Sequence, residues 1–228
     1  MLKGLNHLRS IAIDGPAGAG KSTIARKTAA ELGFIYVDTG ALYRTVALAV
    51  LQNGISTTDT AAIESALSEF HIELKFQNGE QRVFLNDTDV SDEIRSPKVS
   101  MAASTVSAIP AVRQFLFDLQ QEIARKNDVI MDGRDIGTVI LPNADVKIFL
   151  TATAEDRAKR RYDQLLQMGT AVDFDELLKE IKQRDYNDSH RDIAPLKQAP
   201  DAILVDTTGN TLEESIALLR ELILKKLK

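Results

Sequence analysis

The sequence of 228 residues contains no cysteine, no tryptophan and only three histidines. The lack of cysteine excludes disulfide bonds, thiol chemistry and cysteine-based zinc sites. The histidines, His7, His71 and His190, are scattered along the chain, and their spacing indicates no metal cluster. With 44% hydrophobic and 27% charged residues, the composition is otherwise that of a globular protein with one substantial core.

Long apolar runs are missing as well. No run approaches the length of a membrane span, and the first residues, MLKGLNHLRS, lack the apolar core of a signal peptide. We therefore expect a cytoplasmic protein with no membrane partner. The net charge of −5 argues against a nucleic-acid partner. No exposed heptad pattern predicts obligatory assembly, so we expect a monomer.

The apolar and β-branched segments predict an α/β fold, with a five-stranded parallel core sheet flanked by helices. The expected strands are SIAID (10–14), FIYVD (34–38), VIMD (129–132), VKIFLT (146–151) and AILVD (202–206). Helices are expected over about 21–32, 41–52, 110–126 and 212–227, and another begins at Ser96-Pro97. A small antiparallel insert is expected over 69–90, with a hairpin turn at Asn78-Gly79.

The stretch GPAGAGKS, residues 15–22, fits the phosphate-binding pattern G-x-x-x-x-G-K-[ST] between a strand and a helix. Glycines let successive backbone N–H groups curl around an anion, and the helix N-terminus adds the positive end of its dipole. We expect Lys21 to reach the β- and γ-phosphates of ATP and Ser22 to bind Mg²⁺. The predicted ATP-binding residues of this segment are Gly15, Pro16, Ala17, Gly18, Ala19, Gly20, Lys21, Ser22 and Thr23.

Two aspartates end the expected strands beside this loop, Asp14 and Asp132. Each could hold a Mg²⁺-bound water, or could equally cap the end of its strand, and both interpretations stay open.

The phosphate loop alone does not decide between a switch, a motor and a kinase. The sequence has no N-K-x-D motif of GTPases and no D-F-G motif of protein kinases. Motor ATPases usually end an apolar strand with adjacent acidic residues, whereas VIMDG offers a single Asp132. Of these functions, the one that remains is a kinase that transfers a phosphoryl group to a small acceptor molecule.

Ligands of open parallel sheets bind at the carboxyl ends of the strands. The segments DTGALYR (38–44) and DGRDIG (132–137) follow two such ends. We therefore expect Thr39-Gly40 and the residues 133–135 to share one crevice with the phosphate loop.

Arginines are concentrated in RAKRRYDQ (157–164) and RDYNDSHRDIAPL (184–196), on both sides of a loop at 168–170. Arginine forks can neutralise the repulsion between two polyanions, and a closing lid excludes water that would otherwise take the phosphoryl group. We therefore expect a lid and an acceptor that is itself a phosphate. Such an acceptor is already ionised near neutral pH, so it requires no general base.

We expect two helices in this lid, one on each side of the loop at 168–170. In each helix, the spacing of charged residues predicts that several of them lie on one face. Arg157 and Arg161 are spaced i, i+4, in a helix that Thr153 and Asp156 would begin with a capping box. Three further residues share a face if the second helix persists: Arg184, Asp188 and Arg191.

Taken together, GPAGAGKS, DTGALYR, DGRDIGTV, RAKRR and RDYNDSHRDIAPL resemble the bacterial cytidylate kinases in order and spacing, over nearly the whole chain. The resemblance implies a single P-loop nucleoside monophosphate kinase domain over 1–228, using ATP and Mg²⁺ to convert CMP and dCMP into CDP and dCDP. The implied parts are a core (about 1–38, 127–153 and 195–228), an acceptor-binding part with the hairpin insert (39–126) and a helical lid (154–194).

The resemblance also implies roles for single residues. The implied CMP-binding residues are Thr39, Arg44, Ser104, Arg113, Asp135, Arg184, Asp188 and Arg191. The implied catalytic residues are Lys21, Arg157, Arg161 and Arg191, with Arg157 also near the base of ATP. A carboxylate such as Asp135 suits the amino group of cytosine and would repel the carbonyl of uracil. A kinase for UMP, AMP or shikimate, and a nucleotide-dependent switch with little turnover, stay open as alternatives.

Overall fold

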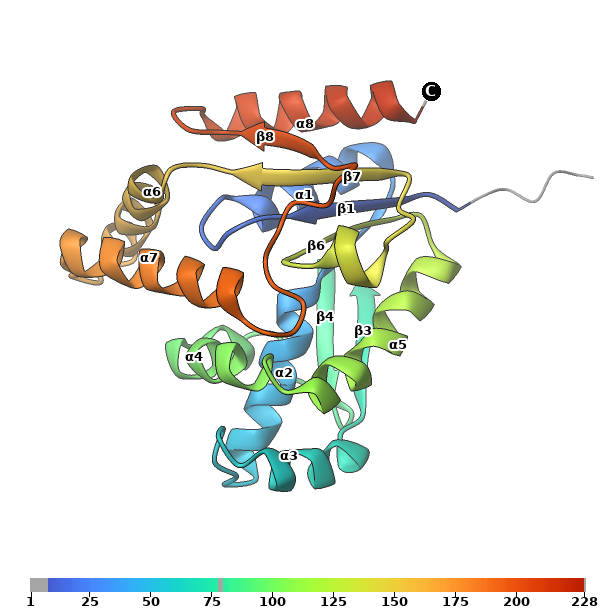
Figure 1. Cartoon of the computed structure of the whole chain (residues 1–228), viewed down its shortest axis with the longest axis vertical. Coiled ribbons are helices and arrows are strands. Elements are labelled where there is room, and N and C mark those ends of the chain that lie inside the picture. The colour runs from blue at the N-terminus through green and yellow to red at the C-terminus, as the bar shows by residue number, and fades with distance from the viewer. Residues whose placement is uncertain (1–7, 78–79, 228) are drawn as a thin grey trace, which may run out of the picture. The chain divides into compact units, whose positions relative to one another are not determined.

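A computed structural model of the chain describes residues 8–77 and 80–227 (Figure 1). The chain divides into two compact units, one formed by 1–36 together with 126–228 and the other by 37–125. The finer division into core, acceptor-binding part and lid stays a prediction. Among the described residues, every helix is too short or too polar to cross a bilayer.

The central sheet has the strand order β2-β6-β1-β7-β8. Its strands are β1 (Ser10–Asp14), β2 (Ile35–Asp38), β6 (Val129–Gly133), β7 (Val146–Thr151) and β8 (Ile203–Asp206). Strand β1 pairs in parallel with β6 and β7, and β7 pairs in parallel with β8. The predicted five-stranded parallel sheet is therefore confirmed. In this register Asp14 lies opposite Gly133, so the loops after β1 and β6 leave the sheet at the same level.

The helices of the first unit are α1 (Lys21–Leu32), α6 (Ala154–Gln167), α7 (Phe174–His190) and α8 (Leu212–Lys226), with a π-helical turn at Ile136–Ile140. Helices α1 and α8 pack together over a core of isoleucine and leucine side chains, and α8 runs beside β7 and β8 in Figure 1. As predicted, α1 ends at Leu32. The next residue, Gly33, caps the helix with a φ of 74°, in the left-handed region. Helices α6 and α7 pack against each other, with the rings of Tyr162 and Phe174 edge to face at 5.8 Å.

Two expectations about the charged helices α6 and α7 need correction. The hydroxyl of Thr153 accepts from the N–H of Asp156 at 3.2 Å, but the N–H of Thr153 donates to the Thr208 hydroxyl, so the reciprocal capping box is not formed. Helix α7 also does not reach Arg191, whose backbone is extended. The chain turns back there, and the N–H of Leu196 donates to the carbonyl of Asp188, which satisfies one of the last helical carbonyls.

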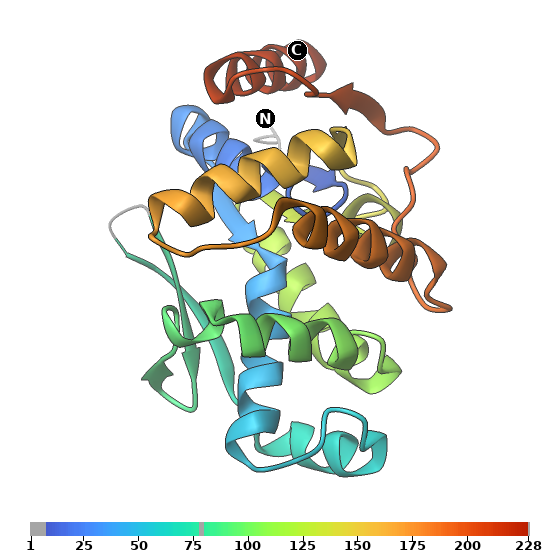
Figure 2. The same cartoon turned by 90° about the vertical axis from the view of Figure 1, so that its left-hand side faces the viewer.

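The second unit consists of helices and a three-stranded antiparallel sheet of order β3-β4-β5. Its elements are α2 (Thr39–Gln52), α3 (Thr60–Ala66), β3 (Ile72–Gln77), β4 (Glu80–Leu85), β5 (Thr88–Asp89), α4 (Pro97–Val106) and α5 (Pro110–Lys126). The predicted antiparallel insert is present, whereas its turn at Asn78-Gly79 lies outside the described residues. Helix α4, in green, crosses α2, in light blue, over a shared apolar core (Figure 2).

Candidate active site

The loop between β1 and α1, residues 15–20, has a backbone that only glycine permits at key positions. At Gly15, where φ is 149°, an added Cβ would lie 1.9 Å from the carbonyl oxygen of Leu150 in β7. Gly20, with a φ of 82°, is the N-cap of α1. Because the first turn of α1 contains no acidic residue, its own side chains do not neutralise the positive end of the helix dipole. Sequence and backbone together form a site for an anion.

Lys21, the first residue of α1, is only 5% exposed. Its Nζ donates to the carbonyl of Pro16 at 2.7 Å, so the ammonium lies against the loop. Burial, and next the positive charge of Arg134, lower the pKa of Lys21 to about 7. An added negative charge near Lys21 would therefore stabilise its protonated form.

Ser22, in the first turn of α1, lies beside Asp132, near the end of β6. The Ser22 hydroxyl donates to Oδ2 of Asp132 at 2.9 Å, and the hydroxyl of Tyr36 in β2 donates to Oδ1 at 2.8 Å. Hydroxyl and carboxylate oxygens are the ligands that Mg²⁺ prefers, so these two residues fit a magnesium site. Tyr36 was not among the predicted site residues, because the phosphate-binding pattern does not include the strand that contains it.

Asp14, the last residue of β1, has a different environment. Its two carboxylate oxygens accept from the N–H groups of Ile136 and Gly137, both at 2.7 Å. Burial raises the pKa of Asp14 to about 6, although these hydrogen bonds oppose the shift. The carboxylate of Asp14 thus anchors the loop after β6, while its two expected roles, in capping and in metal binding, stay predictions.

The loop after β6 carries charges that pair with the end of α7. Arg134 donates from Nε to Oδ2 of Asp188 at 2.8 Å, and Arg191 lies 3.6 Å from Oδ1 of Asp135, which is 4% exposed. The structure therefore brings together three of the residues that were predicted to bind CMP: Asp135, Asp188 and Arg191. Arg134 was not among the predicted site residues, although it lies inside the motif DGRDIG. Arg184 is exposed on α7, one turn before Asp188.

The arginines of α6 have different partners. Arg157 is 4% exposed and donates to the carbonyls of Ala152 and Ala17, at 2.9 Å and 2.8 Å, and to the carboxylate of Asp185. Arg161 is exposed and donates to Oε1 of Gln164 in its own helix at 2.8 Å. The shared i, i+4 spacing therefore does not give these two arginines a shared environment.

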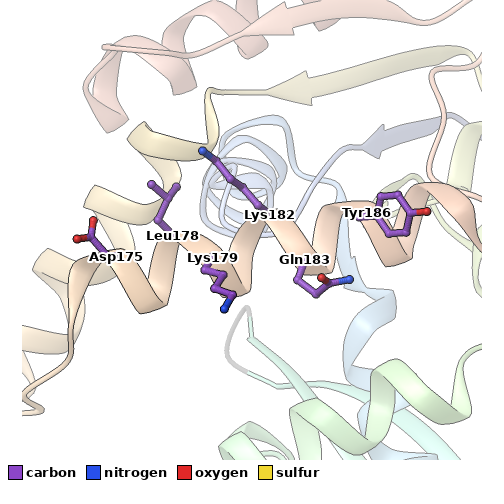
Figure 3. A pocket seen from close by; sticks show the side chains of 6 residues that line it. All are labelled: Asp175, Leu178, Lys179, Lys182, Gln183 and Tyr186. Carbon is purple, nitrogen blue, oxygen red and sulfur yellow. The ribbon is translucent and has the colours of Figure 1, made fainter.

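The exposed side of α7 lines a pocket, formed by Asp175, Leu178, Lys179, Lys182, Gln183 and Tyr186. Leu178 and Lys182 point to one side of the helix and Lys179 and Gln183 to the other (Figure 3). Lys182 pairs with Glu155 of α6 at 2.8 Å. None of the six lining residues belongs to the predicted site.

In the second unit, Asp38 positions the predicted residue Arg44. Oδ1 of Asp38 accepts from the N–H of Ala41 and caps α2, while Oδ2 accepts from Arg44 at 2.7 Å. This cap explains why α2 begins at Thr39, two residues before the predicted start. An added Cβ on Gly40 would lie 3.1 Å from the Arg44 guanidinium, so the glycine makes room for it. Thr39 is buried in the first turn.

The same unit connects the predicted residues Ser104 and Arg113 through Ser107. Arg113 of α5 is buried, donates to the carbonyl of Ser107 at 3.2 Å and lies over the ring of Tyr43 at 5.5 Å. The Ser107 hydroxyl donates to the carbonyl of Ser104, which is exposed near the end of α4.

A parallel sheet whose first strand leads through a glycine loop into a helix beginning Lys-Ser defines a P-loop nucleotide-binding protein. The family model of cytidylate kinase matches residues 11–225. A cytidylate kinase of Caldicellulosiruptor bescii is 54% identical over 219 residues, covering 96% of this chain and 97% of the relative. A cytidylate kinase of Leuconostoc mesenteroides is 53% identical over 213 residues, covering 93% and 95%. The chain belongs to the cytidylate kinase family.

A solved structure shares the fold at low sequence identity. An uncharacterised protein from Eubacterium ventriosum aligns with a TM-score of 0.53 and 13% identity, covering 95% of this chain and 98% of that one. This likeness concerns the fold alone.

Proposed function

We propose that this protein transfers the γ-phosphoryl group of ATP to CMP and dCMP, forming ADP and either CDP or dCDP. The observation that carries the proposal is the family match over residues 11–225, in a chain whose phosphate loop is complete. The paired charges around Asp135 support it, because a switch has no acceptor anion to bind.

On the donor side, the backbone N–H groups of residues 17–20 and of the start of α1 bind the phosphates of ATP. Lys21 adds a charge to the β- and γ-phosphates. Phosphate oxygens favour the ammonium form of Lys21, and they therefore act against the burial that lowers its pKa. Thr23 lies in the same first turn of α1.

Ser22 and Asp132 would hold the Mg²⁺ that accompanies ATP, Ser22 by its hydroxyl and Asp132 by way of a water. Among the described residues, no group of three or more His, Cys, Asp and Glu could hold a metal ion. A Mg²⁺ bound by one or two protein groups together with substrate phosphates and water agrees with this. When bound there, Mg²⁺ would supply positive charge that offsets the negative charge of the phosphates.

On the acceptor side, Asp135 accepts a hydrogen bond from the amino group of cytosine, and Ser104 and Arg113 contact the same base. Arg184 and Asp188 bind the sugar, and Arg44 and Arg191 bind the phosphate. Two features of the structure support these assignments. The carboxylate of Asp135 is buried, so an unsuitable base would leave it without a partner, and a fork such as Arg44 can bind two phosphate oxygens.

The transfer itself needs positioning more than proton chemistry, because an ionised phosphate oxygen of the acceptor is the nucleophile. Lys21, Arg157, Arg161 and Arg191 are the catalytic residues in this proposal. Their positive charges stabilise the negative charge that spreads over the transferred group.

The test is a coupled assay of ADP release with MgATP and, separately, CMP, dCMP, UMP, AMP, GMP and shikimate. We expect fast turnover with CMP and dCMP and at most slow turnover with the others. The controls are reactions without an acceptor and reactions with excess EDTA. Slow ATP hydrolysis that does not depend on the acceptor would show a nucleotide-dependent switch instead, and fast turnover with another acceptor would reassign the substrate.

A further inference from the structure

We propose that Asp185 is a positioning residue for the phosphate loop, acting through Arg157 and without contact to the nucleotide. The two charged helices α6 and α7 would thereby hold the shape of the loop from outside. The proposal rests on the proposed function only in that ATP phosphates bind residues 15–20.

The guanidinium of Arg157 connects its own helix, α6, with three other segments of the first unit. Nε donates to Ala152, just after β7, and Nη1 donates to Ala17 in the phosphate loop. Nη1 and Nη2 both donate to the carboxylate of Asp185 in α7, with the Nη1 bond at 3.1 Å. Most of the donors of this buried side chain are therefore used within the protein.

The bond to Ala17 determines how the loop presents its N–H groups. In a trans peptide the carbonyl of one residue and the N–H of the next point in opposite directions. A donor that holds the Ala17 carbonyl therefore turns the N–H of Gly18 away from Arg157. The stem of Arg157 also packs on the loop, because an added Cβ on Gly18 would lie 3.4 Å from its Cβ.

Asp185 keeps the guanidinium in this position. A buried arginine that loses its carboxylate is a charge without compensation, and it moves toward water or another acceptor. The two-pronged contact also fixes the plane of the fork, which a single bond would not do. Loss of the carboxylate would thus free the Ala17 peptide plane without removing any group from the phosphate loop.

The first experiment compares Asp185→Asn with Asp163→Asn by calorimetric titration with MgATP in the absence of an acceptor. Asp163 is a matched control, because its carboxylate pairs with Lys159 on the surface of α6 and touches no part of the loop. We expect the Kd for MgATP to rise about tenfold in Asp185→Asn, since small misplacements of binding groups have effects of this size or larger. The control should bind MgATP like the wild type, and the Kd for CMP should change less than twofold in both variants.

Two further variants address the mechanism. We expect Asp185→Glu, which keeps the charge, to recover most of the lost MgATP affinity. In a double-mutant cycle, Arg157→Ala with Asp185→Ala should bind MgATP no worse than Arg157→Ala alone, because Asp185 acts through the arginine. Thermal unfolding of each variant identifies the temperature range in which it is folded for the titrations.

The proposal would be overturned by an unchanged Kd for MgATP in Asp185→Asn, by additive losses in the cycle, or by an equal loss of CMP affinity. Failure of Asp185→Glu to bind MgATP better than Asp185→Asn would do the same. All of these are binding measurements without turnover, so a wild-type protein that binds MgATP but does not phosphorylate CMP would still test the role of Asp185.

Discussion

Two loops follow neighbouring strands of the same sheet, residues 15–20 after β1 and residues 134–140 after β6, and they are built differently. The first is made from main chain, with glycines at positions where φ is positive and the buried side chains of Lys21 and Arg157 beside it. The second is made from charged side chains that pair with the end of α7 and the residue after it, Arg134 with Asp188 and Asp135 with Arg191. Backbone suits a group that every nucleotide shares, the phosphate, whereas side chains suit the part that differs between acceptors.

The two loops are nevertheless coupled through Asp14. This residue directly precedes Gly15, and its carboxylate accepts from two N–H groups of the loop after β6. A change in one loop can therefore reach the other through a single side chain. Substitutions at four positions separate the contributions of the two loops and of this connection.

The largest effect is expected for Lys21→Ala in the first loop. The substitution removes the charge closest to the transferred group, and we expect kcat to fall about 100- to 1000-fold or more, because loss of one stabilising group in the transition state has this effect. The fold should be retained, and turnover of CMP in the coupled assay measures the loss.

The control for this variant is Lys27→Ala, an exposed lysine of the same helix α1. Both variants should give the circular dichroism spectrum of the wild type. Turnover of Lys21→Ala near that of Lys27→Ala would contradict the assignment of residues 15–22 as the donor site.

The second loop should govern selectivity. We expect Asp135→Ala to lower the ratio of kcat/KM for CMP over UMP about tenfold to a hundredfold, while the Kd for MgATP changes little. The physical reason is that the buried carboxylate accepts from the amino group of cytosine and repels the carbonyl of uracil, a discrimination of about 1–3 kcal/mol.

The Asn variant makes this test sharper. An amide can donate to the carbonyl of uracil, so Asp135→Asn should shift the ratio further toward UMP than Asp135→Ala does. A CMP-to-UMP ratio equal to that of the wild type in both variants would exclude Asp135 as the residue that reads the base.

The difference between the loops also explains what the sequence could predict. A glycine pattern determines backbone conformation locally, so residues 15–22 were identified from the sequence with their strand and helix. Helical spacing shows which arginines share a face, but not what each one contacts. The partner of Arg157 is Asp185 on the next helix, and the N–H of Thr153 donates to the distant Thr208. Such partners depend on tertiary packing, which the spacing does not contain.

The five core strands were predictable because buried parallel strands are continuous apolar runs. Short elements without such a signal were not predicted, namely α3, β5 and the turn at Ile136–Ile140. The last of these depends on Asp14, which lies more than a hundred residues earlier and accepts its first N–H groups. The sequence left the role of Asp14 open because a strand-end aspartate suits a metal and a cap equally well.

The smallest effects are expected from the two aspartates near the ends of β1 and β6. Asp132→Asn and Asp14→Asn should change different properties of the protein. Asp132 lies beside Ser22, so its loss should raise the Mg²⁺ concentration at half-maximal rate severalfold with little change in stability. Asp14→Asn should leave the Mg²⁺ requirement close to that of the wild type. It should instead lower the free energy of unfolding by about 1–3 kcal/mol, because an amide cannot accept from both Ile136 and Gly137.

Magnesium titrations of the coupled assay and urea unfolding of both variants measure the two quantities side by side. If Asp14→Asn raised the Mg²⁺ requirement as much as Asp132→Asn without a loss of stability, Asp14 would belong to the metal site, and the two loops would share an ion as well as a hydrogen-bonded anchor. If each variant changes only its own quantity, the coupling between the loops is mechanical. A severalfold difference in Mg²⁺ requirement between two aspartates near the ends of adjacent strands would then reflect only their present hydrogen-bond donors, which are backbone N–H groups for Asp14 and side-chain hydroxyls for Asp132.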